Sequence, residues 1–271
     1  MTQKLSDATL NTYYDYDNPL APTAYIRRSD LHFLVAKNSA LAGIVPANAN
    51  SGQSVFFQAP VGYSNNSTFA HTQGLLNACG YFVEYGPNNT SWPTIIPGSQ
   101  TPRYRYRLMQ AIQSTELNGI YGYKEGTGAD NSPPWIASLG NLALPIAENI
   151  IALIILPQSP AVGGSISTDY QYNSRQGLPS PTLHLQSEQL PQILELTLVV
   201  IDEASATRLD TGSATPPQVI ENALQLNNKF TDASRYAADL GDLETALIAA
   251  HINYHILTSA VTLRESKWSN E

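Results

Sequence analysis

The apolar residues of this chain come in short runs, and the two strongest are NIIALIILP at 149–157 and ILELTLVVI at 193–201. A membrane-spanning helix needs about 20 consecutive apolar residues, whereas a strand uses about four to eight. Both runs are rich in β-branched side chains, which favour strands. The 149–157 run is apolar on both faces, so we expect a central strand that is covered on both sides.

Clusters of Gly, Asn and Pro separate several further runs with the character of strands. These runs are AYIRR (24–28), DLHFLVA (30–36), SVFFQAPVGY (54–63), CGYFVEYG (79–86), RYRYRLMQAI (103–112) and YHILTSAVTLRE (254–265). The strands do not alternate regularly with helices, which argues against a doubly wound parallel sheet.

A helical pattern is strong only between residues 216 and 250. Leu240, Leu243 and Leu247 recur there at helical spacing, and Asp232 suits an N-cap. We therefore expect a helical insertion over 204–250, before the last strand of the chain.

The N-terminal segment, residues 1–14, starts like the middle of a helix because no capping residues precede it. Leu5, Ala8 and Leu10 would form one side of an amphipathic helix. We interpret the segment as the end of a longer helix whose first part belongs to a larger precursor. The expected fold class is α+β: a truncated N-terminal helix, then antiparallel β-sheets with the helical insertion, in one domain over 1–271.

The composition limits where such a protein works and what it binds. Only 13% of the residues are charged, and Asn, Gln, Ser, Thr and 15 Tyr must supply much of the polar surface. The net charge of −8 argues against nucleic acid or an anionic membrane as the main partner. We expect a β-rich protein that works outside the cytosol. The single cysteine, Cys79, lies in an apolar run, and we expect it to be a buried small residue.

Asp202 and Glu203 form a carboxylate pair directly after the 193–201 run. They could be a catalytic dyad of a glycosidase, but consecutive side chains on a strand point to opposite faces. We favour a structural interpretation in which Asp202 caps the following turn and Glu203 is solvated. We therefore rank a glycosidase last, behind the structural subunit and the carbohydrate-binding module considered below.

Two other groups of residues could hold metal ions. His251 and His255 have the spacing of zinc ligands on a helix, but we expect the helix to end here, and on a strand they would lie about 13 Å apart. Oxygen-bearing residues in two turns could bind calcium, although neither turn has the spacing of a calcium loop. These residues are Asp15, Asp17, Asn18, Asp130 and Asn131. We expect no cofactor, and loop calcium is the alternative.

The run at 103–112 alternates, with Arg103, Arg105 and Arg107 on one face and apolar or aromatic residues on the other. A basic stripe with interleaved tyrosines could bind nucleic acid, but the chain has no second basic cluster to extend it. We expect a solvated sheet face that pairs with carboxylates.

The segments of this chain also resemble, in order and wording, the Verru_Chthon cassette protein C family, which is a set of predicted prepilin-type proteins of Verrucomicrobia and allied bacteria. The resemblance runs from Thr2 to Trp268. It rests on MTQKLSDATLNTYYDYDNP, SDLHFLV, VFFQAPVGY, LLNACGYFVEYG, RYRYRLMQ, ENIIALIILPQ, LPQILELTLVVIDEASATRL and VTLRESKW. The broader likeness is to W-type minor pilins and to J-type minor pseudopilins of type II secretion. The prepilin cleavage site and hydrophobic helix of the family are missing here.

The resemblance implies a structural subunit without catalytic residues, in a type IV pilus-like or type II secretion-like apparatus. The missing helix would anchor it in the inner membrane, with the head on the periplasmic or extracellular side. Its partners would be other pseudopilin-like subunits, and we expect Leu5, Leu10, Tyr13 and Tyr14 to contact them. The alternative is an extracellular carbohydrate-binding or adhesin module, with Trp92 and Trp135 as stacking residues.

Overall fold

A computed structural model describes residues 1–16, 18, 20–41, 44–50, 52–69, 71–91, 101–122, 134–137, 139–159, 164–165, 167–175 and 186–267. Its strands form three sheets, and every pairing between the described strands is antiparallel. Helices are few, so the expectation of an α+β fold with antiparallel sheets is confirmed.

The largest sheet has six strands in the order β10-β3-β4-β5-β6-β7. Their bounds are β3 Leu34–Lys37, β4 Gln53–Ala59, β5 Asn77–Pro87, β6 Tyr104–Gln113, β7 Leu144–Glu148 and β10 Tyr172–Asn173. The strands β4 and β5 are buried along nearly their whole length, which explains why both of their faces carry apolar residues.

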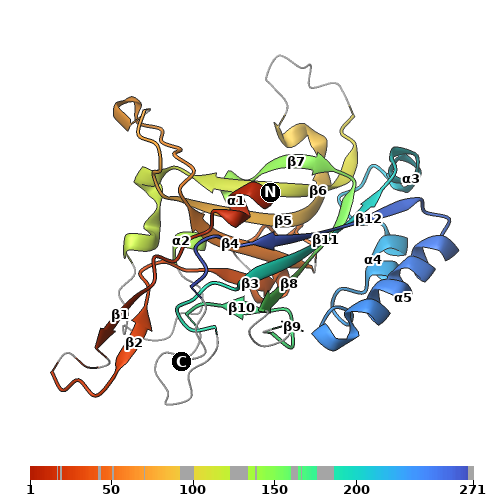
Figure 1. Cartoon of the computed structure of the whole chain (residues 1–271). Coiled ribbons are helices and arrows are strands. Elements are labelled where there is room, and N and C mark those ends of the chain that lie inside the picture. Colours follow the sequence, from red (N-terminus) through yellow and green to blue (C-terminus); the bar gives the residue numbers. More distant parts are fainter. Residues whose placement is uncertain are drawn as a thin grey trace.

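A second sheet has four strands in the order β12-β11-β8-β9, and a separate hairpin pairs β1 with β2 (Figure 1). Their bounds are β1 Tyr13–Tyr16, β2 Tyr25–Arg28, β8 Ile150–Ser159, β9 Gly164–Ser165, β11 Ile193–Ile201 and β12 Tyr254–Thr262. The strand β8 is buried over almost its whole length and contacts β4, β5 and β6 of the larger sheet. The predicted central strand at 149–157 is therefore confirmed, and it joins the two sheets.

Side-chain amides complete the junction at one edge of β8. The short strand β9 pairs with Gln158 and Ser159, and no other described strand lies along the rest of that edge. The Asn50 amide donates to the carbonyl of Ile151 (2.9 Å), and the Gln53 side-chain oxygen accepts the N–H of Ile155. Both amides are buried, so they satisfy backbone groups that would otherwise be desolvated without a partner.

The helical insertion lies between β11 and β12, as predicted. It contains α3 (Glu203–Leu209), α4 (Gln218–Leu224) and α5 (Tyr236–Ala249), with a 3-10 turn, η8 (Ala233–Arg235), before α5. The carboxylate of Asp232 accepts the N–H of Ser234 (2.9 Å), which confirms the predicted cap. Leu243 and Leu247 are fully buried, and the Tyr236 hydroxyl bonds Thr197 of β11 (2.6 Å). The helix α5 thus packs against the smaller sheet, with its first residue bonded to β11 (Figure 1).

The N-terminal helix is shorter than predicted. The helix α1 spans only Thr2–Ser6, and Tyr13 and Tyr14 lie in β1 instead of in a helix. Asn11 has a left-handed φ of 50°, which turns the chain, and the two tyrosines then pair with Arg28 and Arg27 of β2. Cross-strand pairing therefore overrides the apolar spacing that suggested a helix over 1–14.

In the described part of the chain, six other short 3-10 turns and one short α-helix connect the strands. They are η1 Asn38–Leu41, η2 Ser67–Phe69, η3 Asn88–Ser91, η4 Thr115–Leu117, η5 Gly119–Gly122, α2 Pro134–Ala137 and η6 Gly140–Leu142. No helix in the described part of the chain has the length and apolar character needed to cross a membrane.

Candidate functional site

The arginine stripe lies at the start of β6, and two of its three side chains are buried. Arg105 is 2% exposed and Arg107 is 1% exposed, whereas the Arg103 side chain is 56% exposed. The expectation of a solvated sheet face is therefore wrong for Arg105 and Arg107. The expected pairing with carboxylates is confirmed, because each of the three arginines forms a salt bridge.

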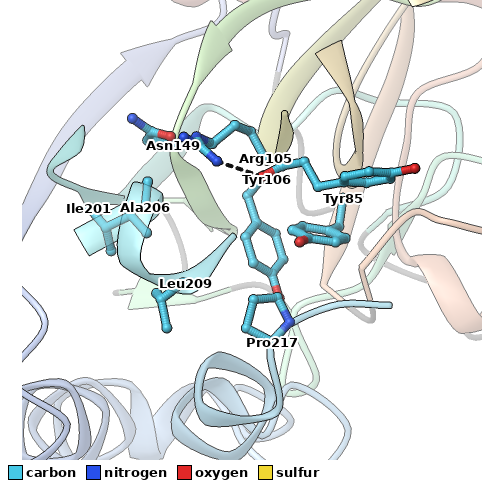
Figure 2. A pocket seen from close by; sticks show the side chains of 9 residues that line it. Tyr85, Arg105, Tyr106, Asn149, Ile201, Ala206, Leu209 and Pro217 are labelled. Carbon is cyan, nitrogen blue, oxygen red and sulfur yellow. Dashed lines mark hydrogen bonds between the residues drawn. The ribbon is translucent and has the colours of Figure 1, made fainter. Parts of the chain in front are cut away.

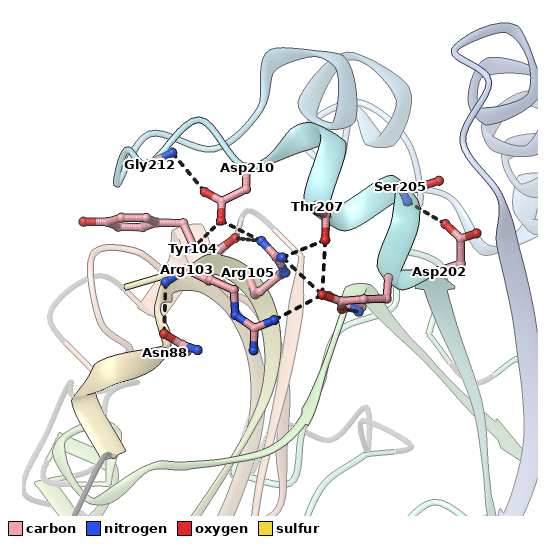
Figure 3. Close-up of polar contacts among 11 residues, drawn as sticks. Asn88, Arg103, Tyr104, Arg105, Asp202, Ser205, Thr207, Asp210 and Gly212 are labelled. Carbon is pink, nitrogen blue, oxygen red and sulfur yellow. Dashed lines mark hydrogen bonds and ion pairs between the residues drawn. The ribbon is translucent and has the colours of Figure 1, made fainter. Parts of the chain in front are cut away.

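Arg105 is the centre of a polar cluster between β6 and α3 (Figure 3). One of its terminal nitrogens, Nη1, donates to the Asp210 carboxylate (2.8 Å), and Nη2 donates to Glu203 (3.3 Å) and to the Thr207 hydroxyl (3.2 Å). Arg103 reaches the same Glu203 oxygen at 3.4 Å. We name these five residues the β6–α3 clamp.

Asp210 fixes the end of α3 in the clamp. Besides Arg105, its carboxylate accepts the backbone N–H of Tyr104 (3.2 Å) and of Gly212 (2.9 Å). Gly212 has a φ of +66°, a conformation that favours glycine, so the turn after α3 can fold back onto the carboxylate. The clamp thus fastens the first helix of the insertion to the six-stranded sheet.

Asp202 caps α3, as predicted. Its carboxylate accepts the N–H of Ser205 (2.7 Å) and the amide of Asn253 (2.9 Å), and these bonds lower its pKa. The neighbouring Glu203 is half exposed, yet it is bound by Asn149, Arg105 and Thr207 instead of being merely solvated, and the Asn149 bond (2.8 Å) is the largest cause of its lowered pKa. Both carboxylates are thus stabilised in the ionised form.

A second buried ion pair lies farther along β6. Arg107 Nη2 and Glu84 Oε1 are 2.5 Å apart, and the two residues face each other across β6 and β5. Both side chains are less than a tenth exposed. A charge inside the otherwise apolar run CGYFVEYG was the signal in the sequence that could have predicted this partner for Arg107.

A small cavity lies beneath the clamp (Figure 2). Tyr85, Tyr104 and Tyr106 line it from the sheet, and Leu209 and Pro217 line it from the insertion. Its volume of about 10 Å³ is room for about one water molecule. The Tyr106 hydroxyl donates to Glu221 of α4 (2.7 Å), and burial, aided by this carboxylate, raises the pKa of Tyr106. The cavity is therefore a packing feature of the joint and is too small for a substrate.

His251 and His255 do not lie on one helix. The helix α5 ends at Ala249, His251 has a left-handed φ of 53°, and His255 lies in β12, so the predicted end of the helix is confirmed. The two residues line an open hollow together with Asp202 and Asn253. Within the ranges that the structure describes, no group of three His, Cys, Asp or Glu side chains is arranged to hold a metal.

The residues suggested for calcium are only partly described. Asp15 lies in β1 and accepts the N–H of Tyr16 (2.7 Å), and Asn18 accepts the N–H of Leu20 (2.9 Å). Both therefore act as local turn or strand residues. Asp17, Asp130 and Asn131 lie outside the described residues.

Cys79 is a buried residue of β5, as predicted. Its side chain is fully inaccessible, and burial raises the pKa of the thiol to about 12. A thiol held in the neutral form is a poor nucleophile, so the geometry fits packing.

The four residues expected to contact other subunits divide into two pairs. Leu5 and Leu10 are 0% and 1% exposed, so the expectation is wrong for them because they pack inside their own chain. Tyr13 and Tyr14 are 43% and 58% exposed on the β1–β2 hairpin and remain accessible to a partner.

The two tryptophans suggested as stacking residues are not both described. Trp135 is 1% exposed, and its ring meets that of His32 edge-on with the centroids 5.8 Å apart. Trp135 cannot stack on an external sugar, so this expectation is wrong. Trp92 lies outside the described residues.

Comparison of the chain with protein-family models, with curated proteins and with solved structures found no match.

Proposed function

We propose that this chain is the head of a pseudopilin-like structural subunit of a type IV pilus-like or type II secretion-like apparatus. The proposal rests on the resemblance of its segments to the Verru_Chthon cassette protein C family. It places the head on the outer face of the inner membrane, where a preceding hydrophobic helix holds it until assembly.

One observation supports the proposal on the structural side: α1 is tied to β6 of the larger sheet and to the segment that directly follows β12 of the smaller one. Lys4 donates to Gln110 of β6 (3.2 Å), while the Arg264 backbone N–H donates to Ser6 (3.0 Å) and its side chain donates to Asp7 (2.8 Å). Leu5, on the inner side of α1, is fully buried. A head that must transmit force or position through an N-terminal helix needs such a rigid attachment. The polar clusters of the chain also act as joints between elements, which suits a scaffold.

Co-expression of the chain with neighbouring prepilin-type genes tests this proposal. We expect co-purification with at least one of their products, weakened by joint replacement of Tyr13 and Tyr14 with serine. Tyr63 has the same 43% exposure as Tyr13 but lies on another loop, so Tyr63→Ser is the matched control. Absence of any association with the wild-type chain would overturn the proposal.

A specific observation also favours the second candidate, a carbohydrate-binding module. Tyr14, Tyr16 and Tyr25 share one face of the β1–β2 hairpin and are 58%, 43% and 65% exposed. The rings of Tyr16 and Tyr25 lie 4.7 Å apart, and no charged residue separates them. Exposed aromatic rings of this kind stack on sugars. A glycan array would support this function if binding disappears in Tyr14→Ala and Tyr25→Ala but persists in Tyr63→Ala.

A further inference from the structure

The outer edge of β12, up to the point where the Arg264 N–H donates to Ser6 of α1, is the longest strand edge that the described residues leave open. The strand lies at the end of the four-stranded sheet, beside β11 (Figure 1). Its residues from Leu257 to Ala260 are all exposed, although successive side chains point to opposite faces. Solvent therefore reaches this part of the strand from both faces.

The backbone of β12 divides its hydrogen-bonding groups between two edges. The N–H of Leu263 donates to Gln192 and the N–H of Asp202 donates to Asn253, both at 3.1 Å. In the register of β12 with β11, the odd-numbered residues of β12 are therefore the ones that bond β11. In an antiparallel pair only alternate residues bond a given neighbour. The N–H and C=O groups that face outward are those of Tyr254, Ile256, Thr258, Ala260 and Thr262. Within the described residues these groups have no partner.

Other open edges carry the features that normally prevent strand pairing, namely proline, charge or short length. The strand β7 contains Pro145 and Glu148, and the β1–β2 hairpin carries Asp15 and Arg28. The edge strands β9 and β10 have two residues each. The strand β12, with the sequence YHILTSAVT, has nine residues and contains no proline, glycine, lysine, arginine or carboxylate.

Two copies of such an edge match each other. In a two-fold antiparallel pair, only the residue on the axis lies opposite its own copy, and each residue before the axis faces one that lies equally far after it. An axis through Thr258 sets Tyr254 opposite Thr262 of the second copy, and Ile256 opposite Ala260. This register uses every outward-facing group on both strands and opposes no like charges.

We propose that two copies of this chain associate through antiparallel pairing of their β12 strands, centred on Thr258. The four-stranded sheets of the two copies then form one continuous sheet. The pairing follows from the strand edge alone and does not depend on the pseudopilin assignment.

Sedimentation velocity of the full chain over a wide concentration range tests the proposal, at moderate salt to screen repulsion between acidic copies. We expect a monomer–dimer equilibrium. Ala260→Pro removes an outward N–H without touching the ladder to β11, and Thr258→Lys opposes two ammonium groups at the axis. Each variant should weaken the dimer at least about tenfold, since two hydrogen bonds or a direct like-charge contact are involved. Leu144→Lys, on the exposed edge of β7, should not change it.

Thr258→Cys tests the register, and the side-chain hydrogen bond of Thr258 that it removes is the long one to the Thr197 hydroxyl (3.4 Å). A hydrogen-bonded antiparallel pair has its Cα atoms about 5.5 Å apart, within disulfide range. Because Cys79 is buried, the new thiol is the reactive one, and mild oxidation should give a covalent dimer, whereas Leu144→Cys should not. A wild-type chain that stays monomeric at every concentration overturns the proposal. So does a dimer that neither Ala260→Pro nor Thr258→Lys weakens, or one that Thr258→Cys does not cross-link.

Discussion

The buried pair of Glu84 and Arg107 predicts a large difference between two chemically identical substitutions. Glu84→Gln leaves the Arg107 guanidinium charged and buried with its carboxylate removed. Breaking a buried ion pair from one side costs about 3 to 5 kcal/mol. Glu203→Gln removes a carboxylate whose side chain is 55% exposed and whose arginine partners include the exposed Arg103, so it should cost under about 1 kcal/mol.

The two variants are compared by urea unfolding and by thermal unfolding followed by circular dichroism. For a chain of this size, each kcal/mol shifts the melting temperature by about 2 to 3 °C, so Glu84→Gln should lower it by about 6 to 15 °C. Replacing both partners, as in Glu84→Gln with Arg107→Met, should recover much of the loss because the buried positive charge is removed together with its carboxylate. Equal and small effects of Glu84→Gln and Glu203→Gln would refute the assignment of this pair as a buried joint.

Three further results are expected. Burial lowers the pKa of His32 from 6.5 to about 3, so below about pH 6.5 the unfolded chain binds a proton that the folded chain does not bind, and stability falls as the pH drops. The free energy of unfolding in urea should therefore decrease from pH 7 to pH 4.5 by about 2 to 3 kcal/mol more in the wild-type chain than in His32→Gln. Cys79 should not react with a thiol reagent until urea unfolds the chain. Reaction of the folded chain at the rate of an exposed thiol would contradict the burial of Cys79. Asp202→Ala should cost about 1 kcal/mol through loss of the α3 cap, measured by urea unfolding, with no loss expected in Asp202→Asn.

The strands and the helical insertion could be predicted from the sequence because each has a local signal. Alternation marks β6, β-branched runs mark β8 and β11, and helical spacing marks α5. The cap at Asp202 was also predictable, since an Asp after a strand and before a helix has few other local roles.

The burial of Arg105 could not be predicted, because it depends on a contact across about a hundred residues of sequence. Alternation places Arg105 on one face of β6, but only the folded chain brings Asp210 over that face, at a sequence separation of 105. The same holds for Leu5 and Trp135. Their apolar or aromatic character was visible, while the elements that cover them are distant in sequence.

We propose that this chain is the head of a membrane-anchored, prepilin-type subunit, and the product of the native gene can test this. The most direct measurement is to isolate the product of the native gene from its own cells, locate it by fractionation and determine its mature N-terminus. We expect a membrane-associated protein whose mature sequence begins upstream of Met1 with about 20 apolar residues, after removal of a short basic leader. A product that begins at Met1 and is recovered wholly in the cytosolic fraction would contradict it.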